Sequence, residues 1–482
     1  HDETPLAHAR RHLTSVLLVT GCDIGCFSVM SANRFFIWVA WVFLVGVVPV
    51  VAKDSRPNIL LFLVDDLGRH QVGCYGSEFY ETPHIDRLAE QGMRFTHAYA
   101  AAAVCSPTRA SIMTGKYPAR LHLTDYIPGR TPQNRKLTTP MMQQGLPLDE
   151  VTIAESLKSA GYATGHFGKW HLNKDKKYEL GRPGDPGSQG FDDVFTTHKP
   201  KAGPPSRYEN DWHHVREITE RATRFIEVNR EKPFFCFVTH NSIHDPEIER
   251  PELIAKYEAK EGAQKKGLKN PRQAAMLDTL DKSFGTLMQT LKTWGLEDNT
   301  LVIFFSDNGQ LGPKNGTPFR GSKGDLYEAG IRMPLIARWP GVIAAKSLNE
   351  ELVISNDFFA TFQEVAGIPV SGSTDGVSLY SLLRGQRATL SREALFWHYP
   401  HYHGSGIGPQ GAIRKGDYKL VEWFEKSAFG EPGAFELYDL SKDPGEANDL
   451  AEALPEVVAE LTTEMEQWRK SVNAQMMEPA AK

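Results

Sequence analysis

Short apolar runs that end in polar residues recur along the chain and predict buried strands. NILLFLVDD (58–66) ends in two aspartates, and TLVIFFSDNG (300–309) also ends in polar residues. A third strand, YATGHFGKW (162–170), follows a helical segment directly. Runs of this length bounded by polar residues are typical of strands covered on both faces.

Segments with a helical apolar period lie around these runs. TPHIDRLAEQG (82–92) has a proline in its first turn and a glycine at its end. TIAESLKSAG (152–161) has Thr152 and Glu155 spaced as a capping box. A longer helix is expected at about 273–294, with its leucines on one face. Strands separated by helices predict an α/β fold with a parallel sheet between two layers of helices.

The pattern changes after residue 384. GAIRKGDYKLVEW (411–423) alternates around a Lys-Gly-Asp turn, and 435–451 resembles a strand, a turn and a helix start. An amphipathic helix follows at 455–472. We therefore expect a large α/β domain over 53–384 and a smaller antiparallel sheet with a terminal helix over 385–482.

The N-terminal part carries a different signal. An unbroken apolar run follows Arg34, and Val50 and Ala52 have the small-residue spacing of a cleavage site. We interpret 30–52 as a signal peptide and expect export to the periplasm or the medium. The run is also long enough to span a bilayer, so an uncleaved membrane anchor remains the alternative. Residues 1–29 show no clear periodicity and are treated as an extension of doubtful origin.

Composition narrows the function classes. The 482 residues carry a net charge of −5 without a long single-sign run, which gives no indication of nucleic-acid binding. Beyond residue 52 the cysteines are Cys74, Cys105 and Cys236, an odd number at wide spacing and a poor disulfide framework. Cys236 lies in an apolar run and is interpreted as a small buried hydrophobic residue.

Unusual polar residues fall at the ends of the predicted strands. In open parallel sheets, ligands bind beyond the carboxyl ends of the strands, so these groups are expected at one edge of one sheet. They are Asp65 and Asp66, Lys169 and His171, His240 and His244, and Asp307 and Asn308.

The oxygen ligands in this set favour a metal ion. Three carboxylates at close range repel each other unless protons or a cation lie among them. Asp65, Asp66, Asp307 and Asn308 offer only oxygen, which suits Ca²⁺ or Mg²⁺ better than zinc. A single aspartate is more often a helix or turn cap, but two such pairs at strand ends favour the metal.

Basic side chains accompany these oxygens. Arg109, Lys169 and Lys323, together with His171 and His244, form an anion-binding set. Lys169 lies between Gly168 and Trp170 directly after an apolar strand, where a purely solvated lysine is not expected.

Cys105 stands at a predicted helix start. CSPTRASIMTG (105–115) has Pro107 in its first turn and a glycine at its end. Free N–H groups at a helix start favour a bound anion, and Arg109 lies one turn further on the same face. A thiolate nucleophile is one interpretation. However, acyl transfer does not need a metal and two lysines.

These residues resemble a known family. Cys105, Pro107 and Arg109 match the pattern C-x-P-x-R, extended by TGKYP (114–118), of the type I, formylglycine-dependent sulfatases. The resemblance runs from PNILLFLVDDLG (57–68) to the 435–451 segment. It implies an alkaline phosphatase-like fold, which is a large mixed, mostly parallel sheet between helices with a smaller C-terminal antiparallel sheet and helix.

The resemblance also implies roles for the residues above. Cys105 would be oxidised to formylglycine by a maturation enzyme and would contact one Ca²⁺ ion, with Mg²⁺ less favoured. Sulfate-ester hydrolysis would then use three groups of residues: Asp65, Asp66, Asp307 and Asn308 for the ion, Arg109, Lys169 and Lys323 for the sulfate, and His171 and His244 as acid and base.

The substrate is indicated less directly. The segment 395–420 gathers aromatic and histidine side chains, and we expect His398, His401 and His403 to join Lys169, His244 and Lys323 in substrate binding. The polar loop 198–214 would lie at the mouth of the site, and LHLTDYIPG (121–129) resembles carbohydrate sulfatases. These features favour sulfated galactose or N-acetylgalactosamine residues of a glycan. The alternative for the tryptophan and tyrosines is a core cluster at the domain interface.

Two other functions remain open at this point. A phosphate or phosphonate monoester hydrolase would use the same scaffold, and a non-catalytic protein that binds sulfated glycans would leave Cys105 unoxidised. His171, His244 and Lys323 favour an enzyme over a binder. His240 is interpreted as structural in preference to a second substrate contact.

Overall fold

A computed structural model describes residues 56–130, 133–175, 177–264, 267–313, 318–370, 372–387 and 389–480. The predicted signal peptide (30–52) and the preceding extension (1–29) lie outside the described residues. Within the described part, no helix combines the length and the apolar character needed to cross a membrane.

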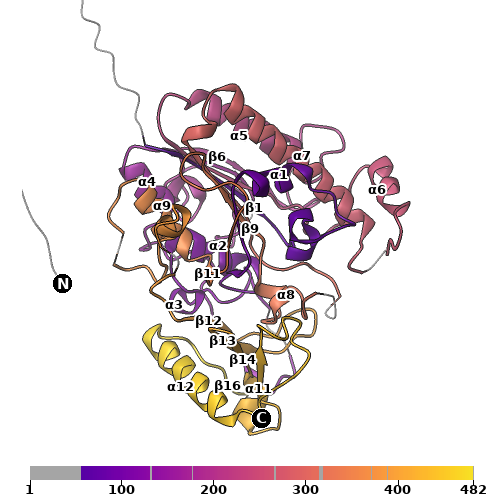
Figure 1. Ribbon diagram of the computed structural model, residues 1–482, viewed down its shortest axis with the longest axis vertical. Helices are drawn as coiled ribbons and strands as arrows, with labels where there is room; N and C mark the ends of the chain where they lie inside the picture. Colours follow the sequence, from indigo (N-terminus) through magenta and orange to yellow (C-terminus); the bar gives the residue numbers. More distant parts are fainter. Residues whose placement is uncertain are drawn as a thin grey trace, which may run out of the picture. The chain divides into compact units, whose positions relative to one another are not determined.

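The centre of the fold is an eight-stranded sheet (Figure 1). Its strand order is β10-β2-β9-β8-β1-β7-β5-β6. Neighbours from β8 to β6 run parallel, whereas β9 is antiparallel to both β8 and β2. The strands are β1 (Asn58–Val64), β2 (Met93–Phe95), β5 (Ala163–Gly168), β6 (Asp193–Thr196), β7 (Phe234–Thr239), β8 (Thr300–Ser306), β9 (Leu335–Arg338) and β10 (Ser347–Asn349). The mixed, mostly parallel sheet confirms the predicted fold class.

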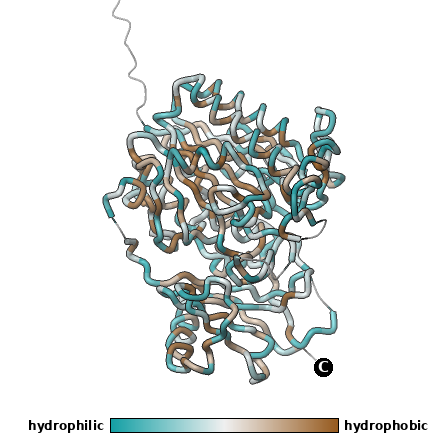
Figure 2. The backbone as a smooth tube through the Cα atoms, turned by 45° about the vertical axis from the view of Figure 1, so that its right-hand side comes forward, coloured by the Kyte–Doolittle hydropathy of each residue, from teal (hydrophilic) through white to brown (hydrophobic). Residues whose placement is uncertain are grey.

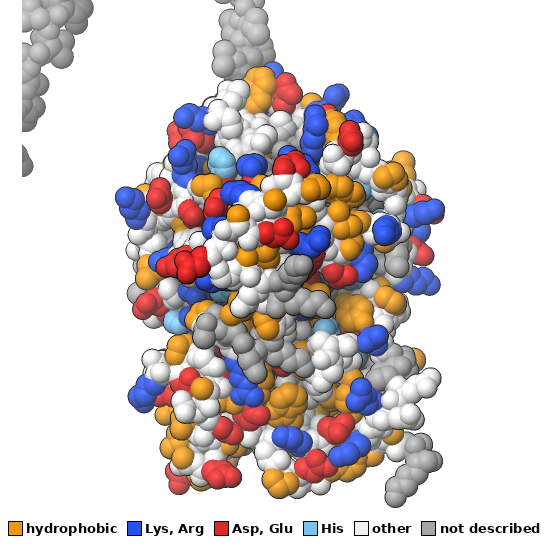
Figure 3. Space-filling view, turned by 90° about the vertical axis from the view of Figure 1, so that its right-hand side faces the viewer, with side chains coloured by type: hydrophobic (Ala, Val, Ile, Leu, Met, Phe, Trp, Pro, Cys, Tyr) orange, Lys and Arg blue, Asp and Glu red, His pale blue; other side chains and the backbone are white. Residues whose placement is uncertain are grey.

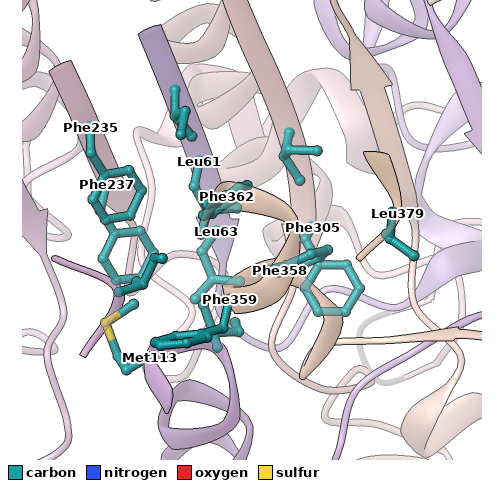
Figure 4. Packing of buried hydrophobic residues seen from close by; sticks show 14 of the residues in the cluster. Leu61, Leu63, Met113, Phe235, Phe237, Phe305, Phe358, Phe359, Phe362 and Leu379 are labelled. Atoms are coloured by element: carbon teal, nitrogen blue, oxygen red, sulfur yellow. The ribbon is translucent and has the colours of Figure 1, made fainter. Parts of the chain in front are cut away.

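Helices cover both faces of this sheet (Figure 1). One face packs against α2 (Cys105–Thr114), α4 (Ile153–Ser159) and α9 (Asp357–Val365). In Figure 4, phenylalanines of α9 and Met113 of α2 meet Leu61, Leu63 and Phe237 from the strands. The other face packs against α1 (Pro83–Gln91), α5 (Val215–Val228), α6 (Pro251–Glu258) and α7 (Pro271–Thr293). Figure 2 shows the strands as the most hydrophobic part of the chain between these layers.

The local signals in the sequence account for the helix ends. Thr152 accepts from the Glu155 N–H and the Glu155 carboxylate accepts from the Thr152 N–H, which confirms the predicted capping box of α4. The helix α2 begins at Cys105 and ends before Gly115, whose φ of 71° is left-handed. A helix thus starts at the cysteine, as its sequence predicts.

A smaller antiparallel sheet lies near the C-terminus, as predicted. It has the order β12-β13-β14-β15, and α12 packs on β13 and β14. Its elements are β12 (Ala394–Tyr399), β13 (Gln410–Lys415), β14 (Tyr418–Trp423), β15 (Phe435–Asp439) and α12 (Pro455–Ser471). The remaining short elements are β3 (Ala98–Tyr99), α3 (Pro118–Leu121), β4 (Leu137–Thr138), α8 (Glu328–Ile331), β11 (Val353–Ile354), α10 (Tyr380–Leu383), α11 (Phe424–Phe429) and β16 (Glu478–Pro479).

On the face drawn in Figure 3, basic and acidic side chains are interspersed.

Candidate active site

The candidate site lies at the carboxyl ends of four neighbouring strands. Asp65 and Asp66 follow β1, Asp307 and Asn308 follow β8, Lys169 follows β5, and His244 lies in the segment after β7. Since β8, β1, β7 and β5 are adjacent and parallel, all of these residues emerge at the same edge.

Gly168 allows the close approach that brings Lys169 into the site. Its φ is 124°, and a Cβ at this position would lie 1.9 Å from the carbonyl oxygen of Thr239 on β7. The Lys169 N–H then donates to that same oxygen at 2.7 Å. Position 168, at the end of β5 and directly before Lys169, therefore requires a glycine.

Arg109 connects α2 to the strand ends. It is 2% exposed, and its Nε donates to Asp307 Oδ2 at 2.8 Å. Its Nη1 donates to the carbonyl oxygen of Lys169 at 2.7 Å and to Thr239 Oγ1. The guanidinium thus holds the first turn of α2, and with it Cys105, against the sheet edge.

The two lysines each pair with one aspartate. Lys169 Nζ lies 2.7 Å from Asp65 Oδ2, and Lys323 Nζ donates to Asp66 Oδ1. Asn308 Nδ2 also donates to Asp66 Oδ1, at 2.7 Å. Lys323 Nζ lies 3.2 Å from Cys105 Sγ, so a basic group reaches the position where the sequence places the reacting residue.

The donor set fits a hard cation. Asp65 Oδ1, Asp66 Oδ2 and Asn308 Oδ1 are buried oxygens without a hydrogen-bond partner. One ligand atom from each of Asp65, Asp66, Cys105 and Asp307 lies within 4.8 Å of the others. Buried oxygens are rarely left unpaired, and an oxygen-rich cluster suits Ca²⁺. The four oxygen donors named from the sequence are therefore brought together around Cys105.

The groups around the site shift the pKa values of Asp65 and Asp307 in opposite directions. Burial opposes the charge of Asp65, but Lys169, His244, Lys323 and Arg109 outweigh it and hold the pKa of Asp65 well below its usual range. Burial together with the charge of Asp65 raises the pKa of Asp307 to about 6. Asp307 therefore ionises less readily than a free carboxyl group.

Cys105 is not a poised thiolate. It is 1% exposed, and burial raises its pKa to about 12 despite the opposing effect of Lys169 and Lys323. A thiol that stays protonated at neutral pH is a poor nucleophile. This argues against direct thiolate catalysis.

The two site histidines differ in protonation. Burial and the neighbouring Lys169 hold the pKa of His171 well below 6.5, and its Nε2 lies 2.7 Å from the carbonyl oxygen of Ile127. That hydrogen bond places the proton on Nε2 and leaves Nδ1, buried and unpartnered, as an acceptor. Burial lowers the pKa of His244, but Asp66, Asp65 and Asp245 together outweigh it and raise the pKa above 6.5. His244 Nδ1 lies 2.9 Å from Asp245 Oδ1.

A pocket of about 400 Å³ opens onto Cys105. Its wall includes Lys169, His171, His244 and Lys323, and also Tyr126 and His403. His198, Lys199 and Ala202 line it as well, so the loop 198–214 lies at this pocket as expected.

Two of the predicted substrate-binding residues, His398 and His401, do not lie at the pocket. His398 is buried with its Nε2 2.8 Å from the carbonyl oxygen of Gln475, and its ring packs on Phe424. His401 is buried with its Nε2 2.8 Å from Thr124 Oγ1. Neither lines the pocket, whereas His403 does. His398 packs inside because β12 is covered on both faces, whereas His401 lies beyond the end of β12 and is held by Thr124.

Other aromatic residues of this segment follow the core interpretation. Trp397 is buried and donates to the carbonyl oxygen of Ala100, and Tyr399 is buried with its hydroxyl 2.9 Å from Asp125. His240 is buried, packs on Phe62 and does not line the pocket. These residues stabilise the fold around the site without facing a ligand in the pocket.

Sequence reasoning passed over two pocket residues, Thr197 and Asn241. Both line the pocket, and each follows a strand of the central sheet. Their position after a strand was the available signal, but uncharged side chains at strand ends are too common to be selected without the structure.

Comparison with known proteins agrees with this geometry. Residues 57–368 match the family model described as Sulfatase, and residues 322–471 match the one described as N-sulphoglucosamine sulphohydrolase, C-terminal. A sulfatase of Formosa agariphila is 32% identical, over 82% of this chain and 85% of that protein.

Two further relatives concern carbohydrates. An N-acetylgalactosamine-6-O-sulfatase of Bacteroides thetaiotaomicron is 30% identical, over 86% of this chain and 93% of that protein. The crystal structure of Ps i-CgsB in complex with k-i-k-neocarrahexaose superimposes with a TM-score of 0.70 at 25% identity, covering 86% of this chain and 92% of that one.

Proposed function

The chain belongs to the sulfatase family, and on that premise we propose that it removes sulfate from a sulfated sugar, with formylglycine at position 105 and one Ca²⁺ ion. It is a sulfuric ester hydrolase by family. The proposal concerns the chemistry at residue 105, the ion and the substrate.

One observation carries the proposal. Asp65, Asp66 and Asn308 each keep a buried oxygen without a hydrogen-bond partner, and carboxylate oxygens of Asp65, Asp66 and Asp307 cluster with the side chain of residue 105. Lys169 and Lys323 are paired with this cluster. This arrangement matches a divalent cation next to an anionic ester, since the cation satisfies the oxygens and the basic groups bind the anion.

The ion would be held by Asp65, Asp66, Asp307 and Asn308, together with residue 105. When bound, it supplies positive charge that stabilises the sulfate ester and the charge developing in transfer. Lys169 and Lys323, which are paired with Asp65 and Asp66, bind sulfate oxygens. Arg109 keeps the first turn of α2 in place through Asp307 and Lys169.

Hydrated formylglycine at position 105 would supply two hydroxyl groups on one carbon, one as a nucleophile toward sulfur and one whose loss of a proton would release sulfate by C–O cleavage. The thiol of Cys105, which stays protonated, offers neither group.

His171 and His244 carry out different proton transfers. His171 Nδ1 is an unprotonated acceptor within the pocket wall and removes the proton that triggers sulfate release. His244, whose pKa is raised, donates a proton to the leaving alcohol together with Lys323.

The proposed sugar substrate rests on two features. The pocket is lined beyond the basic cluster by Tyr126, His198 and His403, which suit the faces and hydroxyls of a sugar. A relative of 30% identity is an N-acetylgalactosamine-6-O-sulfatase. We therefore propose sulfated galactose or N-acetylgalactosamine residues of a glycan as the substrate class, and export directed by residues 30–52 as the route to it.

Mass analysis of the peptide that contains residue 105 tests the chemistry. After co-expression with a formylglycine-generating enzyme, we expect the mass loss of thiol-to-aldehyde conversion and turnover of 4-nitrophenyl sulfate in preference to 4-nitrophenyl phosphate. Cys105→Ala abolishes turnover, whereas Cys236→Ala, a buried cysteine of β7 outside the pocket, is the matched control and retains it. Full activity with an unmodified thiol contradicts the proposal, and preference for phosphate contradicts the reaction class.

A further inference from the structure

Two uncharged side chains in the pocket wall hold polar atoms without partners. Asn241 is 1% exposed, and both its Nδ2 and its Oδ1 lack a hydrogen bond. Thr197 is 3% exposed, and its Oγ1 lacks one as well. Buried polar groups without partners cost folding free energy and are rare. At a pocket wall, such atoms are explained by a ligand that pairs with them.

The fold fixes these two residues on either side of Lys169. Thr197 follows β6, and its N–H donates to the carbonyl oxygen of Gly168 at 2.9 Å. Asn241 follows β7, on the other side of β5. Ser242 and Ile243, which follow Asn241, are held by backbone hydrogen bonds to Asp65. The Asp65 N–H donates to the Ser242 carbonyl oxygen at 3.3 Å, and the Ile243 N–H donates to the Asp65 carbonyl oxygen at 3.0 Å. The pair therefore flanks a lysine that binds the sulfate in the proposed function.

The chemistry of the pair differs from that of the sulfate-binding residues. Sulfate oxygens carry negative charge and are matched by Lys169, Lys323 and the ion. An amide offers one donor group and one acceptor, and a hydroxyl offers both, which matches the donor and acceptor character of an alcohol hydroxyl. A neutral site next to a charged one thus suits the part of the substrate that carries no charge.

We propose that Asn241 and Thr197 form a hydroxyl-binding subsite that recognises a free hydroxyl of the sugar close to its sulfated position. The inference rests on the proposed sugar substrate. The two residues determine specificity by positioning the leaving group, and they take no part in the proton transfers.

The test compares a sugar sulfate with a sulfate ester that has no hydroxyl. The probes are the 4- and 6-sulfates of galactose and N-acetylgalactosamine, and 4-nitrophenyl sulfate. For Asn241→Ala and for the nearly isosteric Thr197→Val, we expect kcat/KM on the best sugar sulfate to fall about tenfold each. On 4-nitrophenyl sulfate, both variants stay within about threefold of the parent, because this ester makes no hydroxyl contact.

A deoxy analogue sharpens the measurement. For the parent protein, removing the recognised hydroxyl from the sugar sulfate is expected to lower kcat/KM about as much as the substitution does. For the variant, the deoxy analogue and the complete sugar sulfate are expected to have the same kcat/KM. Thr223→Val is the matched control, since it removes a buried, unpartnered hydroxyl on α5 outside this pocket and leaves both activities unchanged. Thermal unfolding establishes that each variant is folded.

Three outcomes overturn the inference. Equal losses on both kinds of substrate show that the residues act on the structure or the sulfate. Unchanged activity on the sugar sulfates shows that the residues make no substrate contact. If the parent turns over 4-nitrophenyl sulfate but no sugar sulfate, the proposed sugar substrate itself fails, and this inference fails with it.

Discussion

Asp66→Asn tests the calcium site with a readout other than activity. Asp66 has a left-handed φ of 61°, a conformation that asparagine adopts at least as readily as aspartate. The substitution therefore keeps the backbone and the shape of the side chain and removes the charge. One oxygen without a hydrogen-bond partner, Oδ2, is lost as an ion ligand.

The expected shift follows from the linkage between binding and folding. Ca²⁺ at a hundred times its Kd stabilises the parent by about 2.7 kcal/mol. The compact unit from Lys53 to Lys482 has an unfolding entropy of about 0.9 kcal/mol/K. Saturating Ca²⁺ therefore raises the Tm of the parent by about 3 °C, and the variant loses this rise. Without Ca²⁺, the variant is itself destabilised by up to about 3–5 kcal/mol, because buried Lys323 loses its carboxylate partner.

Differential scanning calorimetry of parent and variant, each with Ca²⁺ and with a chelator, measures both effects. Asp281→Asn is the matched control, because this buried carboxylate accepts from the N–H groups of His84 and Ile85 at the start of α1 and belongs neither to the donor cluster nor to the pocket wall. It is expected to lower the Tm but to retain the Ca²⁺-dependent rise. An undiminished rise in Asp66→Asn would refute the assignment of Asp66 as an ion ligand.

Three further predictions concern other buried ionisable residues. Lys169→Met leaves Asp65 without its partner and removes a sulfate contact, so kcat/KM on 4-nitrophenyl sulfate is expected to fall at least about a hundredfold in steady-state assays; a loss under tenfold contradicts the role. His171→Ala is expected to keep transfer of the sulfuryl group to residue 105 but to block sulfate release, so intact mass spectrometry after reaction with substrate should detect a sulfate ester on residue 105; its absence contradicts a base at this position. Burial raises the pKa of Glu446 to about 7, so the folded chain keeps a proton that the unfolded chain releases near pH 4.5. Stability is therefore lost as pH rises from about 4.5 to 7, by up to ~3 kcal/mol, and Glu446→Gln flattens this dependence in urea unfolding; an equal slope in the two proteins refutes it.

Much of the scaffold could be read from local patterns. The apolar runs before Asp65 and Asp307 predicted strands, and Thr152 and Glu155 predicted a helix start, because burial and capping act on residues close in sequence. The charged residues that follow these strands could also be recognised from the local sequence. The rule that parallel strands end at one edge then predicted that these groups meet.

The histidines of the C-terminal sheet could not be placed this way. In β12, Trp397, His398 and Tyr399 are all buried, since one face packs on Tyr99 and the other on Phe424. The sequence of a strand shows which residues share a face, but not whether a second layer covers that face. His403, beyond the end of the strand, lines the pocket.

The sequence by itself determined the elements, the charged residues at their ends and the family motif around Cys105. Only the tertiary structure decided which oxygens are left without partners, that His171 keeps an unpaired ring nitrogen in the pocket wall, and that Asn241 and Thr197 flank Lys169. The physical reason is that hydrogen-bond satisfaction depends on groups far apart in the chain: Asp66 meets Asn308 and Lys323 only once β1 and β8 have paired.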